Sequence, residues 1–133
     1  MPVVLTDLAA GHVFPPIRFT VDAAQSRAYR DATGDGLELY DSAGVAPPLA
    51  VAALALGALL GEVSLPDGTL HASEALTYAA AVPVGAELEC RATLTQRSVR
   101  AGYVVSVLDS DIVLEGKTAL STRATVLSPA VPS

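Results

Sequence analysis

Few side chains of this 133-residue sequence are suited to acid–base or nucleophilic chemistry. There are two histidines, His12 and His71, and one cysteine, Cys90. A lone thiol forms neither an internal disulfide nor a metal site, so Cys90 is expected to pack as a small hydrophobe. His71 lies in a mostly apolar segment, which favours a structural histidine, and His12 is expected at the surface. Asp35 stands in Gly-Asp-Gly, where a turn favours aspartate for backbone reasons, so a structural role stands beside a catalytic one.

Composition and motifs exclude several classes of protein. The sequence has no glycine-rich phosphate loop, no metal-ligand cluster and no Ser-His-Asp pattern. Its net charge of −6 argues against a nucleic-acid partner, which would require a basic face. The first ten residues already contain Asp7 and lack the order of a signal peptide, so a cytoplasmic location is the expectation.

One apolar segment organises the rest of the chain. Residues 47–61, PPLAVAALALGALLG, hold no charged and no hydrogen-bonding side chain, and their apolar residues fall on every face of a helix. Such a helix has to be wrapped by the fold or buried in lipid, and lipid needs about 20 apolar residues. Because Pro47 and Pro48 suit a first helical turn, the segment predicts a buried central helix of roughly four turns, not a membrane span.

The segments before this helix predict one strand and one shorter helix. Residues 12–21 alternate like a strand whose first half is weakened by Pro15 and Pro16. Asp22 is a suitable N-cap for a helix that runs to about Thr33. The loop at 37–46 then lies directly before the central helix, so its side chains are expected over that helix's N-terminus.

After the central helix, apolar and polar residues alternate with the period of β-strands. Residues 69–82 predict a long strand, and 86–97 alternate with apolar residues at 88, 90, 92 and 94 on one face. Two more strands are expected at 103–114 and 118–127, with a frayed tail at 128–133. A helix followed by a four-strand meander predicts an α+β fold, in which a curved antiparallel sheet wraps a buried helix.

Four motifs, in this order, resemble those of the MaoC-like (R)-specific enoyl-thioester hydratases and dehydratases. They are LAAGHVF at 8–14, YRDATGD at 29–35, VAPPLA at 45–50 and LHASEALTYAAAVPVGAEL at 70–88. The third is similar to the Ala-Pro-Pro start of the central helix in the branch related to fungal fatty-acid-synthase dehydratase domains. The motifs span nearly the whole chain, so the resemblance implies that residues 1–133 form a single hot-dog domain.

The resemblance also implies an acid–base site. In active members, a Gly-Asp pair is followed five places after the Asp by a histidine, and the two hold a water that adds to an enoyl thioester or leaves a 3-hydroxyacyl thioester. Asp35 matches the aspartate, but Tyr40 stands where the histidine is expected. A tyrosine, with a pKa near ~10, donates a hydrogen bond but is a poor base near neutrality. The implied dyad of Asp35 and Tyr40 is therefore a weakened one.

The implied substrate-binding residues lie elsewhere in the chain. The start of the central helix, formed by Ala46, Pro47, Pro48 and Leu49, would bind the substrate. Backbone N–H groups of this helix terminus would polarise the thioester carbonyl, because the helix dipole favours negative charge there. His71 matches a position of the family motif and is a candidate pocket residue. No cofactor and no metal are implied, because coenzyme A or an acyl carrier arrives as part of the substrate.

The expected partner is a second hot-dog subunit. Hydrophobic residues make up 51% of the sequence and charged ones only 17%, which indicates that apolar surface is covered in an oligomer. Members of the resembled family are dimers, so a homodimer or a heterodimer with a related subunit is expected.

Two other functions stay open. A hot-dog acyl-CoA thioesterase would place a carboxylate in the central helix, and none occurs before Glu62 at its far end. A non-catalytic acyl-binding subunit of a hydratase heterodimer is favoured by Tyr40 and opposed by the Gly-Asp pair at Asp35.

Overall fold

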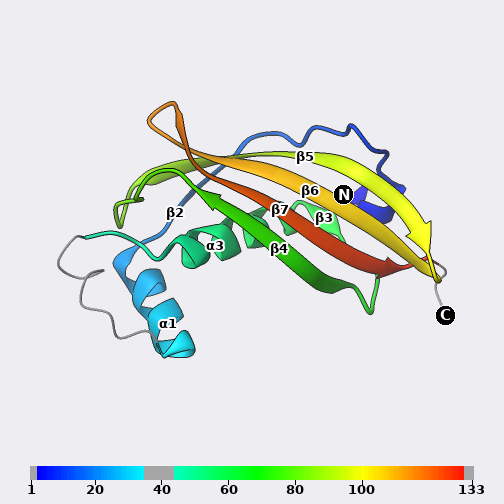
Figure 1. Ribbon diagram of the computed structural model, residues 1–133, viewed down its shortest axis with the longest axis horizontal. Helices are drawn as coiled ribbons and strands as arrows, with labels where there is room; N and C mark the ends of the chain where they lie inside the picture. The colour runs from blue at the N-terminus through cyan, green and yellow to red at the C-terminus, as the bar shows by residue number, and fades with distance from the viewer. Residues whose placement is uncertain (1–2, 35–43, 131–133) are drawn as a thin grey trace.

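The computed structural model describes residues 3–34 and 44–130. One five-stranded antiparallel sheet arches over the central helix α3 (Pro48–Leu60), and the shorter helix α1 (Ala23–Thr33) lies at one end of the arch (Figure 1). The predicted α+β architecture, a curved sheet wrapped around an apolar helix, is confirmed. No described helix is long and apolar enough to cross a membrane.

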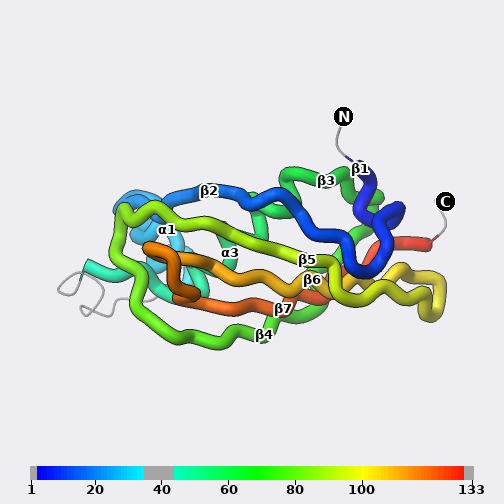
Figure 2. Tube along the Cα trace, turned by 90° about the horizontal axis from the view of Figure 1, so that it is seen from above, coloured from blue at the N-terminus to red at the C-terminus, as the bar shows by residue number. Residues whose placement is uncertain are grey.

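The sheet combines one early strand with four later ones, in the order β2-β5-β6-β7-β4. Its strands are β2 (Ile17–Thr20), β4 (Leu70–Tyr78), β5 (Glu87–Arg100), β6 (Tyr103–Leu114) and β7 (Lys117–Pro129). A separate parallel pair joins β1 (Val3–Val4) to β3 (Val63–Ser64), and a 3-10 turn spans Leu5–Asp7 between β1 and β2. Figure 2 shows β2 and β4 along the two opposite edges of the large sheet.

The predicted four-strand meander is wrong in one respect. Strands β5, β6 and β7 are joined by hairpins, but β4 pairs with β7 and not with β5. The reason is the connection at 79–86, which crosses the end of the sheet instead of making a tight turn. The N–H groups of Ala79 and Ala80 both donate to the carbonyl of Ala119 in β7, which also ends β4 at Tyr78 and not at the predicted residue 82.

This crossing connection also holds the start of α3. The N–H of Ala46 donates to the carbonyl of Val82 at 2.8 Å, and the N–H of Val84 donates to the carbonyl of Gly44 at 2.8 Å. The N–H of Gly85 donates to the carbonyl of Val21 at 2.8 Å, directly before α1. One short segment thus ties down the beginning of both helices.

Helix termini follow the sequence signals closely. Asp22 caps α1 by accepting from the N–H of Gln25 at 2.7 Å, while the Gln25 side chain accepts from the N–H of Asp22, which completes a capping box. Gly34 ends α1 in a left-handed conformation with φ of 71°, which glycine adopts without strain. Pro48 occupies the first turn of α3, as predicted.

Two predicted boundaries at the chain ends are corrected. The strand predicted at 12–21 is regular only over β2, because Pro15 and Pro16 interrupt the ladder and leave an isolated bridge between Val13 and Thr93. The tail predicted to fray from Ser128 instead continues β7. Ser128 is fully buried and hydrogen bonded to Thr69 at 3.0 Å.

The core lies between the concave face of the sheet and α3. The alternation predicted for β5 is confirmed, since the side chains at 88, 90, 92 and 94 are all buried. Leu108 and Leu120 from β6 and β7 are fully buried beside Val51 and Leu59 of α3. Burial of these branched side chains is the main term that stabilises the fold.

Replacing Leu108 with Ala should lower the free energy of unfolding by about 2–5 kcal/mol, because a fully buried leucine leaves a cavity when it is truncated. Chemical denaturation followed by circular dichroism measures this change. Val99→Ala is the control, since Val99 is 59% exposed and should lose under about 1 kcal/mol. Equal losses in the two variants would contradict this account of the core.

Candidate functional site

The N-terminus of α3 offers a backbone hydrogen-bond donor. The N-cap, Pro47, makes no side-chain cap, and Pro48 has no N–H. The N–H of Ala50 donates to the carbonyl of Pro47 at 3.0 Å, whereas the N–H of Leu49 has no acceptor among the described residues. Because the helix dipole adds partial positive charge here, this terminus is suited to an anionic or strongly polarised oxygen.

The four residues predicted at this terminus differ in how far they are exposed to solvent. Ala46 and Pro47 are buried and Pro48 is half-buried, so they form the packed base of the helix start. Leu49 is 57% exposed, although it is large and apolar. A ligand or a partner at this end of α3 would therefore meet Leu49 first.

The predicted dyad of Asp35 and Tyr40 lies outside the described residues. The structure describes the residues that flank it, namely Gly34 at the end of α1 and Gly44 before α3. Gly44 and Val21 both bond to the crossing connection that also binds Ala46. Both ends of the 22–44 segment are therefore held at the end of the sheet where α3 begins.

His71 lies on edge strand β4, away from the start of α3. Its side chain is 40% exposed, and its Nε2 is 3.6 Å from Oε2 of Glu74. A strand rises about 3.3 Å per residue, so the seven steps from His71 to Tyr78 cover about 23 Å. Tyr78 is at the end of β4 that adjoins the start of α3, as Figure 1 shows. Within one chain, the structure does not bring His71 together with the predicted residues at 46–49.

The cysteine is placed as the sequence indicated. Cys90 is a free thiol, 1% exposed on the helix-facing side of β5. Burial raises the pKa of this thiol, an effect that a hydrogen bond with Ser110 partly opposes. A buried neutral thiol is a poor nucleophile, so Cys90 is a packing residue.

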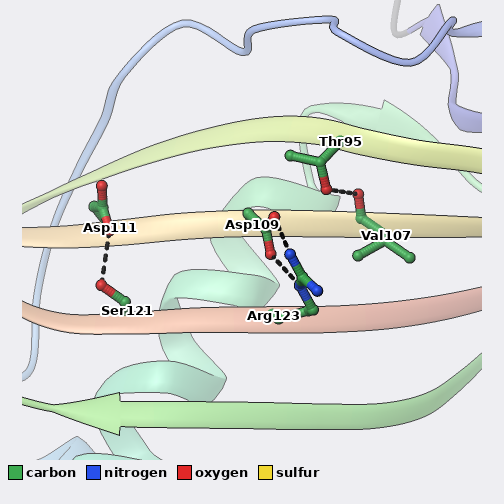
Figure 3. A network of polar contacts seen from close by, with 6 residues as sticks. All are labelled: Thr95, Val107, Asp109, Asp111, Ser121 and Arg123. Atoms are coloured by element: carbon green, nitrogen blue, oxygen red, sulfur yellow. Dashed lines mark hydrogen bonds and ion pairs between the residues drawn. The ribbon is translucent and has the colours of Figure 1, made fainter.

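A second recess lies on the opposite, convex face of the sheet and was not predicted. It is a groove of about 720 Å³ between the N-terminal segment at 13–16 and outward-facing residues of β5, β6, β7 and β4. Figure 3 shows its polar floor. Arg123 holds Asp109 with two hydrogen bonds of 2.8 and 3.0 Å, and Ser121 donates to Asp111 at 2.8 Å. The sequence signal was the alternation of polar residues along β6 and β7.

The charges in this groove are paired within the chain. The guanidinium of Arg123 lowers the pKa of Asp109 below its usual value, mainly through their hydrogen bonds. Arg91 lies 3.2 Å from Glu89 on the same face. Since both arginines already have carboxylate partners, the groove does not present the uncompensated cation that an anionic ligand would require.

Comparisons with solved structures identify the architecture. A MaoC-like dehydratase from Rhodospirillum rubrum has a TM-score of 0.77 and 22% identity, over 98% of this chain and 99% of that one. The (R)-hydratase from A. caviae involved in PHA biosynthesis has a TM-score of 0.74 and 20% identity. The match covers 92% of this chain and 98% of that one. A chain of the C-terminally truncated HadBC (3R-hydroxyacyl-ACP dehydratase) complex from Mycobacterium tuberculosis has a TM-score of 0.77 and 19% identity. The match covers 93% of this chain and 100% of that one.

This chain has a hot-dog fold. Neither a family sequence model nor a curated protein sequence matches it, so the likeness rests on structure. The hot-dog architecture implied by the four sequence motifs is thereby confirmed. One fold supports many functions, so the reaction has to be argued from the residues at the site.

Arg123→Gln should raise the pKa of Asp109 toward its usual value, because the two charge-assisted hydrogen bonds are lost. A lowered carboxyl pKa stabilises the folded state above the unfolded pKa, and this contribution is lost as the pH falls through the folded pKa. The variant should therefore lose a contribution that is present at neutral pH. Carboxyl NMR titration of Asp109 measures the shift, and an unchanged pKa would contradict the pairing. Arg91→Gln, whose partner is Glu89, is the matched control.

Proposed function

We propose that this chain is a MaoC-like hot-dog domain that binds acyl thioesters and adds water to 2-enoyl thioesters, or removes it from 3-hydroxyacyl thioesters. The observation that carries the proposal is the start of α3, where the N–H of Leu49 has no acceptor among residues 3–34 and 44–130 and lies at the positive end of the helix. A donor in this position suits the thioester oxygen, which gains negative charge as water adds. Full-length similarity to the R. rubrum dehydratase and the A. caviae (R)-hydratase supports the same reaction class.

In this proposal, Asp35 and Tyr40 share the proton transfers. Asp35 directly follows Gly34, the described end of α1, so a fixed helix end leads into the proposed site. The carboxylate of Asp35 would orient the water, and the Tyr40 hydroxyl would donate a hydrogen bond to it. Ala46, Pro47 and Pro48 would shape the pocket floor, and Leu49 would contact the substrate. No cofactor and no metal take part, and coenzyme A or an acyl carrier belongs to the substrate.

A second candidate function is a non-catalytic acyl-binding subunit in a heterodimer. Tyr40, in place of the expected histidine, favours it. Two of the similar structures are complexes, namely HadBC and ChsH1-ChsH2, both from M. tuberculosis. A thioesterase is the weakest candidate, since α3 carries no carboxylate to activate water.

The purified protein should hydrate a short trans-2-enoyl-CoA, followed as loss of the conjugated absorbance. Asp35→Asn should lower kcat/KM by about 10²-fold or more, because a general acid–base group contributes roughly 10²–10⁴. Asp67→Asn is the control, since Asp67 lies in an exposed turn far along the chain. Turnover that is indifferent to Asp35 would overturn its role. If the wild type is inert but binds a saturated acyl-CoA, the non-catalytic subunit is the correct function.

We also propose that the domain pairs with a second copy through β4 and α3. Strand β4 is a nine-residue sheet edge without proline, and an unpaired edge of this kind is a template for another strand. On α3, Leu49, Ala53 and Gly57 are exposed at intervals of four residues and form an apolar stripe on one side of the helix. The small residues in this stripe permit another helix to approach closely.

Light scattering at micromolar concentration should therefore report a dimer. Ala53→Glu should shift the protein toward monomer, because an unpaired carboxylate would be buried in the covered apolar stripe. Val99→Glu introduces the same charge at an exposed site on the β5–β6 hairpin and should leave the dimer intact. A monomeric wild type, or equal behaviour of the two variants, would contradict this interface.

A further inference from the structure

His71 and Glu74 form an imidazole–carboxylate pair that the Asp35 site does not use. Nε2 of His71 lies 3.6 Å from Oε2 of Glu74, and the two side chains are 40% and 19% exposed. The other carboxylate oxygen, Oε1 of Glu74, is buried and has no hydrogen-bond partner in the structure described here. Buried polar atoms are nearly always paired, so this oxygen calls for a donor beyond those that the described residues supply.

The arrangement is that of an activated imidazole. The ring nitrogen that faces Glu74 is Nε2, which leaves Nδ1 free to accept a proton. A carboxylate behind an imidazole fixes its tautomer and stabilises the imidazolium that forms. The separation is longer than a direct hydrogen bond, and such contacts in unliganded sites commonly shorten when substrate binds. The more exposed member is the imidazole and the more buried one is the carboxylate, as this role requires.

The pair faces α3. His71 is opposite Val126 and Glu74 is opposite Ala124, two buried residues on the helix-facing side of β7. Cross-strand neighbours share a face, so His71 and Glu74 lie on the concave side of the sheet. Neither α3 nor these β7 neighbours bring a titratable side chain toward the pair. Among the described residues, His71 is therefore the one ionisable side chain that the structure pairs with this carboxylate.

Two-fold pairing of β4 would carry this pair to the other subunit's helix. Two identical edge strands that extend one sheet across a two-fold axis run antiparallel. The beginning of one β4, which holds His71, then lies beside the Tyr78 end of its partner. That end adjoins the start of α3, where Leu49 is exposed. Within one chain, His71 and the start of α3 are about 23 Å apart along β4. In the dimer, His71 would instead lie near the start of the partner's α3.

We infer that His71, oriented by Glu74, is the general base of the partner subunit's site. The inference rests on the proposed function and revises one part of it: the proton transfers pass from Asp35 and Tyr40 to His71, and Asp35 orients the water. In hydration, the water oxygen bonds to C3 of the enoyl thioester while its proton passes to Nδ1 of His71. The π electrons of the C2–C3 bond move to C2 and the thioester oxygen. The imidazolium then returns the proton to C2, which leaves a 3-hydroxyacyl thioester and a neutral imidazole.

The kinetic test compares the two histidines of the chain. His71→Gln should lower kcat/KM for enoyl-CoA hydration about 10²-fold or more, and His12→Gln should leave it unchanged. Glu74→Gln should cost about 10-fold or more, since it removes the group that positions the base. The acid limb of the kcat/KM pH profile should disappear in His71→Gln, which a purely structural loss would not cause. A His71→Gln variant that matches His12→Gln would overturn the inference.

Mixing two inactive variants tests whether His71 of one chain acts in the site of the other chain. In a mixed dimer of Asp35→Asn and His71→Gln chains, one site keeps both native residues if His71 acts on the partner. Statistical exchange then restores about a quarter of wild-type activity, because half of the dimers are mixed and each has one intact site. If His71 acts within its own chain, no site is intact. Absence of restored activity would overturn the inference.

A cross-linking test separates this inference from the proposed reaction. In a Cys90→Ser background, chains carrying both His71→Cys and Leu49→Cys should form covalent dimers with a short bismaleimide. Chains carrying His12→Cys and Leu49→Cys should not. Cross-linking in a protein without hydratase activity would overturn the reaction and keep the site geometry. Hydratase activity without the cross-link would keep the reaction and overturn the shared site.

Discussion

The fold depends on one requirement: a thirteen-residue helix with no polar side chain has to be covered on all sides. The concave sheet covers one side of α3, with Val51, Ala55 and Leu59 buried against it. The opposite side, along Leu49, Ala53 and Gly57, has no covering element among the described residues. The uncovered side is the basis of our proposal that a second subunit covers α3, and in that proposal the same contact determines where the site lies.

Much of this could be predicted because the decisive signals are local. The N-cap at Asp22, the proline in the first turn of α3 and the alternation along β5 each depend on neighbouring residues, and each was predicted correctly. The order of strands in the sheet is not local. The Pro-Val-Gly sequence at 83–85 suggests a turn, but its meaning depends on hydrogen bonds to Val21 and Gly44, which are distant in sequence.

The candidate site likewise has features that local sequence predicted and features that depend on residues distant in sequence. Sequence motifs pointed to the start of α3, and the N–H of Leu49 at that end has no acceptor in the part of the chain that the structure describes. They also pointed to His71 as part of the same pocket, yet strand geometry puts it about 23 Å away in its chain. Burying a lone carboxylate is costly, which favours a partner for Glu74 wherever it faces the helix. It is paired with His71 on the inner face, and a one-residue irregularity between His71 and Ser73 is what gives both side chains this face.

A divided site of this kind follows from the way a hot-dog helix is covered. The positive end of α3 lies at the Tyr78 end of β4, whereas His71 lies near the other end and Glu74 lies at the middle of the strand. In the proposed dimer, antiparallel pairing of two such strands would exchange their ends, so His71 of each chain would lie near the helix terminus of the other chain. The surface that shields the apolar helix would then also assemble the catalytic groups. Activity would depend on assembly, and a carboxylate that is poorly compensated within one chain would gain its missing donor from the other chain or from the substrate water.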